Sequence, residues 1–123
     1  AEEGGDRERQ AERGGDLYRI YCRNCHGETG HGDGPMVEVL TVRPTDQTKL
    51  SQDRDGEFPA DEVHAAIDGR DEILAHGSSK MPVWGLAFRE FDTDVDQERH
   101  VQARIQQLIE YLRTIQAAPG AKK

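Results

Sequence analysis

The sequence predicts an all-α protein with long loops. A long amphipathic helix is clear near the C-terminus, where apolar residues recur at steps of three and four in a polar background. Segments rich in glycine and proline separate it from shorter helical patterns. No segment shows the sustained apolar-polar alternation of a half-buried strand. We therefore expect three to five helices and no sheet.

The first half of the chain predicts two short helical elements. The first is expected to start near Gly14 and to end at Cys22, with an apolar side between them. Residues 27–35 are so dense in turn-forming residues that they must be a loop. A brief helix from Met36 to Leu40 and then an extended loop should follow.

The second half predicts two helices separated by a loop. Proline and acids begin a helix over about residues 60–69, which Gly69 ends. Residues 76–84 contain glycine, serines and a Met-Pro pair, and are expected to form an extended loop. The last helix ends before Pro119 and carries an apolar stripe of Val101, Ile105, Leu108, Leu112 and Ile115.

Length and composition indicate one domain that needs help to fill its core. The chain has 123 residues, of which 34% are hydrophobic and 33% are charged. Side chains alone would build a thin core, which a large apolar cofactor would fill. The net charge of -8 argues against a nucleic-acid partner, because binding phosphates requires a clustered positive surface.

The charge pattern divides the chain into three predicted parts. Residues 1–13 are rich in acids and arginines and almost free of apolar groups, so we expect a flexible, solvated arm that could act as a membrane tether. Residues 14–118 form the domain, and residues 119–123 form a tail.

The two cysteines carry the chemistry. Cys22-Arg23-Asn24-Cys25-His26 has the spacing of a covalent haem attachment site, in which the thiols bind the haem and the adjacent histidine ligates the iron. A zinc site would need further ligands, and a thiol redox site would need a strand-helix-strand context. A disulfide at so short a range would be strained. Haem c is the favoured interpretation, with zinc and thiol chemistry as the alternatives.

The iron needs a second axial ligand, for which Met81 is the favoured candidate. His31 and Met36 follow His26 too closely to reach the opposite face of the haem easily, whereas Met81 lies 55 residues further along. His76 is the second choice. The surface interpretation is preferred for the two remaining histidines, His64 and His100.

These motifs resemble those of a class I cytochrome c of the bacterial type. The resemblance covers residues 14–116 and rests on the haem signature together with Gly32-Asp33-Gly34-Pro35, Pro44-Thr45-Asp46 and Met81-Pro82-Val83-Trp84-Gly85. It implies the cytochrome c fold, with helices and long loops wrapped around one covalently attached haem.

The resemblance also implies roles for individual residues. Gly14 and Tyr18 would let the first helix cross the last one closely, at Leu108 and Tyr111. The carbonyl of Pro35 would accept a hydrogen bond from the His26 imidazole. The residues implied to touch the haem elsewhere are Arg43, Arg70 and Trp84 at its propionates and Leu40 and Ile67 in its pocket.

The expected function is electron transfer, because a haem with two protein ligands leaves no iron position for a substrate. We expect a monomeric periplasmic shuttle, or one on the outer face of the membrane, and not an enzyme. It would take electrons from a quinol-oxidising complex or dehydrogenase and pass them to a terminal oxidase or reductase. The alternative is a haem subunit or domain of a larger dehydrogenase or peroxidase-type enzyme.

Overall fold

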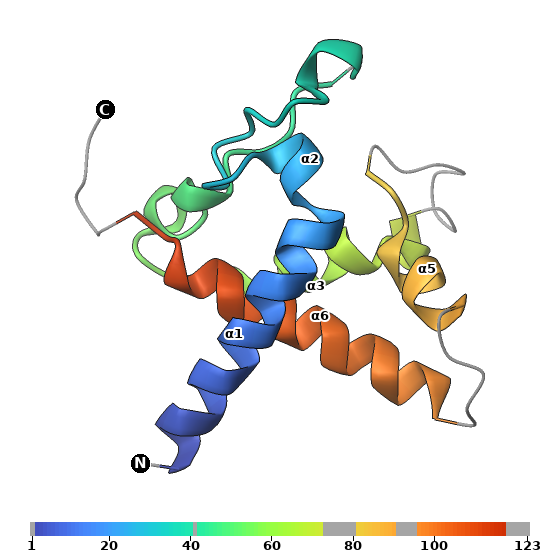
Figure 1. Ribbon diagram of the computed structural model, residues 1–123. Helices are drawn as coiled ribbons and strands as arrows, with labels where there is room; N and C mark the ends of the chain where they lie inside the picture. The colour runs from blue at the N-terminus through green and yellow to red at the C-terminus, as the bar shows by residue number, and fades with distance from the viewer. Residues whose placement is uncertain (1, 41, 73–80, 91–95, 118–123) are drawn as a thin grey trace.

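The computed structural model describes residues 2–40, 42–72, 81–90 and 96–117, and these residues form helices and loops without a strand (Figure 1). This confirms the predicted all-α class. The elements in chain order are α1 (Glu2–Tyr21), α2 (Arg23–His26), the 3₁₀ turns η1 (Val37–Val39), η2 (Gln47–Lys49) and η3 (Gln52–Arg54), then α3 (Ala60–Asp68), α5 (Trp84–Glu90) and α6 (Gln97–Thr114).

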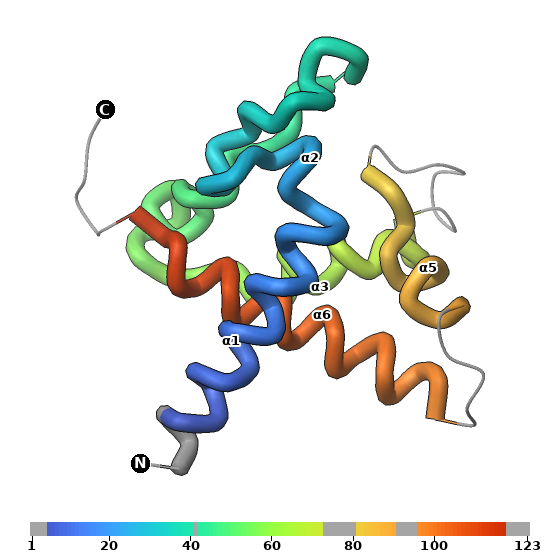
Figure 2. The backbone as a smooth tube through the Cα atoms, in the orientation of Figure 1, coloured from blue at the N-terminus to red at the C-terminus, as the bar shows by residue number. Residues whose placement is uncertain are grey.

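The fold is organised by the crossing of α1 and α6, which Figure 2 shows near the middle of both helices. Gly14 lies at the contact, and a Cβ atom there would overlap the backbone carbonyl of Gln107 and come within 2.9 Å of the Cβ of Tyr111. Tyr18, one turn further along α1, is 1% exposed and packs its ring 5.1 Å from that of Tyr111. The crossing therefore has the expected residues on both helices.

The core lies mainly along α6. Tyr18 of α1 and Phe88 of α5 pack with the α6 stripe, and Val63 and Ile67 of α3 complete the cluster. Four residues of the predicted stripe, Val101, Ile105, Leu108 and Leu112, are buried in α6. The fifth, Ile115, is the half-buried C-cap of the helix, and Ile109 is buried beside the stripe.

The first helix is longer than the sequence predicts. The expected start near Gly14 is wrong, because α1 begins at Glu2 and continues without a break. The N-terminal half is rich in Glu, Arg, Gln and Ala, which have high helix propensity, and Asp6 and Arg9 form an ion pair one turn apart. The proposed boundary after residue 13 thus falls inside a helix, and the division into arm, domain and tail stays a prediction.

The other helices differ from expectation in one place. The helix expected over about residues 60–69 is α3, and Gly69 ends it in the left-handed conformation with φ of 72°. Trp84 was expected in a loop but begins α5. The stacking of Trp84 on Phe88 and the edge contact of Phe88 with Tyr21 give this short helix an aromatic anchor. Residues 76–80 of the predicted loop lie outside the described residues.

None of the described helices combines the length and the hydrophobicity that a membrane-spanning segment needs.

The crossing predicts that Gly14→Ala destabilises the protein. The added methyl group must displace the backbone of α6, so we expect a loss of about 2 kcal/mol in the free energy of unfolding, measured by denaturant titration with circular dichroism. Gly5→Ala on the same helix is the control, because the nearest atom to its Cβ is the Arg9 guanidinium at 3.6 Å. An equal loss in both variants would contradict the close crossing.

Candidate haem site

The Cys22–His26 segment lies where α1 gives way to α2. The His26 N–H donates to the Cys22 carbonyl at 2.9 Å, and the Tyr18 hydroxyl donates to the Gly27 carbonyl at 2.6 Å. Both cysteines are partly buried, and they form no disulfide with each other. Burial, and then the neighbouring Cys25, raise the pKa of the Cys22 thiol to about 12.

His26 is held as a neutral imidazole. Its ring is buried and its Nδ1 donates to the Thr45 carbonyl at 3.1 Å. Burial lowers the pKa of His26, although the Thr45 hydrogen bond acts in the opposite direction. A neutral imidazole with Nδ1–H fixed in this way presents Nε2 to a metal.

The partner of His26 corrects the expectation for Pro35. The structure places the Thr45 carbonyl on Nδ1, and not the Pro35 carbonyl. The loop around Pro35 is instead fixed on α2, because the Gly34 N–H donates to the Cys25 carbonyl at 3.1 Å and the Met36 N–H donates to the Asn24 carbonyl at 2.9 Å.

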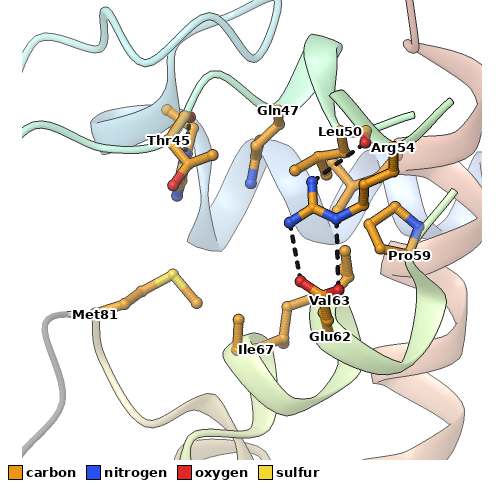
Figure 3. Close-up of a pocket in the computed structure, with 12 residues that line it drawn as sticks. Thr45, Gln47, Leu50, Arg54, Pro59, Glu62, Val63, Ile67 and Met81 are labelled. Carbon is orange, nitrogen blue, oxygen red and sulfur yellow. Dashed lines mark hydrogen bonds and ion pairs between the residues drawn. The ribbon is translucent and has the colours of Figure 1, made fainter. Parts of the chain in front are cut away.

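Two adjoining cavities, of about 220 and 260 Å³, share His26, Thr45 and Met81 as lining residues. The first is drawn in Figure 3 and its further lining consists of Gln47, Leu50, Arg54, Pro59, Glu62, Val63, Ala66, Ile67 and Leu112. The second is lined in addition by Cys25, Leu40, Val42, Arg43, Pro44 and Pro82. Both are mainly apolar and both reach the imidazole.

Met81 extends its thioether into the first cavity, across from Thr45 (Figure 3). Because Thr45 binds the His26 imidazole, the histidine and the methionine reach the same cavities from distant parts of the chain. The iron ligands chosen from the sequence are thus brought together. Their coordination of iron stays a prediction.

The other candidate ligands lie elsewhere. Met36 is 44% exposed and lines neither cavity. His31 bonds Thr29 and His64 bonds Gln102 through side chains. His76 lies outside the described residues.

The residues that the resemblance implied around the haem divide into two groups. Leu40, Arg43 and Ile67 line the cavities. Trp84 lines neither cavity and packs instead against Tyr21, with ring centroids 5.2 Å apart. Contact of any of these residues with haem stays a prediction.

Arg70 is engaged in a network away from both cavities. Its guanidinium binds Asp68 at 2.6 Å and Glu98 at 2.7 Å. The hydrogen bonds from Arg70 lower the pKa of Asp68 and lower that of Glu98 to about 2. The structure therefore shows Arg70 joining the end of α3 to α6, and does not bring it to the haem cavity.

The sequence does not single out four polar lining residues, Thr45, Gln47, Arg54 and Glu62. Thr45 belongs to the Pro44-Thr45-Asp46 motif, but its role depends on a backbone carbonyl, which no side-chain pattern reveals. Gln47 and Arg54 lie in a polar stretch that reads as an ordinary surface loop.

The lining fits a haem. An apolar cavity beside paired thiols, with a neutral imidazole and a thioether on its walls, has the donor set of a haem attached to cysteines and held by histidine and methionine. The zinc alternative lacks support, because no group of three or more His, Cys, Asp or Glu side chains within the described ranges could hold a metal ion.

Comparison with known proteins gives one family. Residues 9–112 match the family described as "Cytochrome C oxidase, cbb3-type, subunit III". A search of curated proteins and a search of solved structures each returned no significant match. The match spans α1 to α6 and includes the cysteine pair and His26, so the cofactor is haem c.

The Arg70 network predicts a pH-dependent contribution to stability. Since the folded pKa of Glu98 is lowered from 4.5 to about 2, its stabilisation is complete above pH 4.5 and is lost as the pH falls toward 2. Glu98→Gln should lower the free energy of unfolding at pH 7 by about 1 kcal/mol, a figure reduced for solvent screening.

The measurement is denaturant unfolding at several pH values, and the difference from the unsubstituted protein should vanish near pH 2. Glu8→Gln, which changes an exposed carboxylate on α1, is the control. A Glu98→Gln difference that persists unchanged at low pH would show that the ion pair is not its source.

Proposed function

We propose, from the fact that the chain belongs to the cytochrome c oxidase, cbb3-type, subunit III family and carries haem c, that it transfers single electrons through one haem ligated by His26 and Met81. Haem c supplies a one-electron couple of iron. The chain's own residues supply the attachment, the ligands and the apolar surroundings.

One observation carries the ligation proposal. His26 and Met81 are 55 residues apart in sequence, yet both line both cavities. Cys25, next to His26, lines the second cavity. An imidazole and a thioether together raise the reduction potential relative to two imidazoles, because the softer sulfur ligand favours Fe(II).

Electron transfer is favoured over catalysis by the same ligand pair. If His26 and Met81 both bind the iron, no position on it would be open to a substrate or peroxide. The mainly apolar cavity walls would limit the access of water to an iron bound there. These features suit a carrier and not a peroxidase-type enzyme.

The partners we propose are a quinol-oxidising complex or dehydrogenase as donor and a terminal oxidase or reductase as acceptor, outside the cytoplasm. The acidity of the chain is concentrated in residues 53–72, which hold eight acids and two arginines and include the Arg54–Glu62 part of the cavity wall. A partner with a basic docking surface would match this charge. The contact would be small and transient.

A second candidate is a haem subunit that stays within an oxidase complex. The observation that favours it is the family description, which names an oxidase subunit. In that arrangement electron transfer is the same, but the donor meets the assembled complex. The shuttle and the complex-bound subunit differ in oligomeric state and in membrane attachment, and both properties stay proposals.

The ligation proposal predicts the effect of Met81→Ala. The oxidised protein should lose the weak absorption band of a methionine–iron(III) bond, the reduced protein should bind carbon monoxide, and the potential should fall. Met36→Ala is the matched control, because Met36 lines neither cavity and should leave all three unchanged. Retention of the band in Met81→Ala would exclude Met81 as the ligand.

The partner proposal predicts salt-dependent exchange with respiratory complexes. The purified holoprotein should be reduced by a quinol-oxidising complex and oxidised by a terminal oxidase, and both rates should fall as salt is added. Stopped-flow absorbance of the haem measures each rate. Failure with both complexes would reject the shuttle, whereas stable co-purification with an oxidase would favour the second candidate.

A further inference from the structure

An ion-pair cluster outside both cavities lies against the segment that leads from Met81 into α5. The Arg70 cluster, as we call it, consists of Asp68, Arg70 and Glu98. The guanidinium donates to Asp68 from Nε at 2.6 Å and from Nη2 at 2.9 Å, and to Glu98 from Nη1 at 2.7 Å and from Nη2 at 2.8 Å. Two bidentate contacts on one planar group fix its orientation.

The acidic end of the cluster is held in place as well. Gln102, one turn further along α6, donates from Nε2 to a carboxylate oxygen of Glu98 at 2.8 Å. Oε1 of Gln102 is bonded to Nε2 of His64 on α3. The cluster therefore has a position that α3 and α6 fix together.

Gly85, the second residue of α5, lies directly on this cluster. It is buried, and a Cβ atom there would overlap Oδ1 of Asp68 and lie 2.6 Å from Nε of Arg70. Close by, Val83 packs on the end of α3, where a Cβ atom on Gly69 would lie 3.3 Å from the Cα of Val83. The backbone at the start of α5 is thus in contact with the cluster and with the residue that ends α3.

A short segment connects this contact to the cavity. Three residues, of which the first is Pro82, separate Met81 from Gly85. The proline ring fixes one backbone dihedral of the segment, and the Val83 carbonyl accepts from two N–H groups of α5 at 3.1 and 3.2 Å. A displacement of Gly85 would therefore also move the Met81 thioether, which extends into the first cavity (Figure 3).

We propose that the Arg70 cluster positions the haem ligand Met81, because it holds Gly85 in place and so keeps the thioether in the cavity. Arg70 is in this sense a positioning residue, and it touches neither the haem nor the methionine. When the cluster is broken, the start of α5 can shift, and a larger fraction of the protein has Met81 away from the iron. This role presupposes ligation by His26 and Met81, as in the proposed function.

The test measures how fast the reduced full-length holoprotein binds carbon monoxide at pH 7. Carbon monoxide enters only when Met81 leaves the iron, so its binding rate follows the population of the open form. Arg70→Gln should increase the rate about tenfold and weaken the methionine–iron(III) band of the oxidised protein. The ring contact between Trp84 and Tyr21 remains in this variant, so the band should not disappear.

Two further variants separate position from charge. Arg70→Lys keeps the positive charge, but an ammonium group cannot form two bidentate contacts, so a smaller increase is expected. Glu98→Gln changes the net charge in the opposite direction to Arg70→Gln and should also increase the rate. An increase shared by all three variants cannot come from net charge.

Two controls exclude other causes. Arg9→Gln breaks the exposed ion pair with Asp6 on α1, far from α5, and should leave the rate unchanged. Ile105→Val weakens the buried core, lines neither cavity and should lower the free energy of unfolding without changing the rate. If Arg70→Gln binds carbon monoxide no faster than these two controls, the proposal is overturned.

Gly85→Ala tests the route between the cluster and Met81. The added methyl group must displace either the cluster or the start of α5, so the rate should rise, and adding Arg70→Gln should then have little further effect. Full multiplication of the two effects would overturn the route through Gly85. The two Arg70 variants decide the proposal by themselves if Gly85→Ala does not fold.

The unsubstituted protein distinguishes this proposal from the one on ligation. Absence of the methionine–iron band from the unsubstituted protein would overturn ligation by Met81 and the positioning role together. A normal band there, with variants of the Arg70 cluster that bind carbon monoxide as slowly as the controls, would overturn the positioning role alone.

Discussion

The backbone contact between α1 and α6 at Gly14 determines where the haem attachment segment lies. From this crossing α1 runs one turn to Tyr18, whose hydroxyl binds the Gly27 carbonyl just after His26. The α1 helix and this one buried hydrogen bond therefore fix the position of His26 relative to α6. Any widening of the crossing would move the imidazole relative to Met81, which lies on the segment that leads into α5.

The two sides of the fold are stabilised in different ways. The side formed by α1, α5 and α6 has an apolar core of closely packed side chains. The loops between α2 and α3 contribute Thr48 and few other buried side chains, and hydrogen bonds such as that from the Ala117 N–H to the Thr48 carbonyl hold them in place. These loops line the cavities, so a haem placed there would provide the apolar packing that their own side chains lack.

The sequence predicted the parts of this protein that depend on local pattern. The α6 stripe, the glycine that ends α3 and the cysteine spacing are each readable within one element. The sequence does not reveal contacts that backbone groups make. One such contact is the hydrogen bond between His26 and the backbone carbonyl of Thr45. The ion pairs that Arg70 forms with Asp68 and Glu98 were also not readable, because they join the end of α3 to α6 across the fold. The full length of α1 is not readable from the apolar pattern, because its N-terminal half lacks apolar residues and yet is helical.

The length of α1 has a consequence for the path of electrons. Twenty residues of helix span about 30 Å, and the N-terminal end of α1 lies at the opposite end of this helix from α2 (Figure 1). Tunnelling slows steeply with distance through protein. A redox group located at the first turns of α1 would therefore exchange electrons only slowly with a haem attached at Cys22 and Cys25.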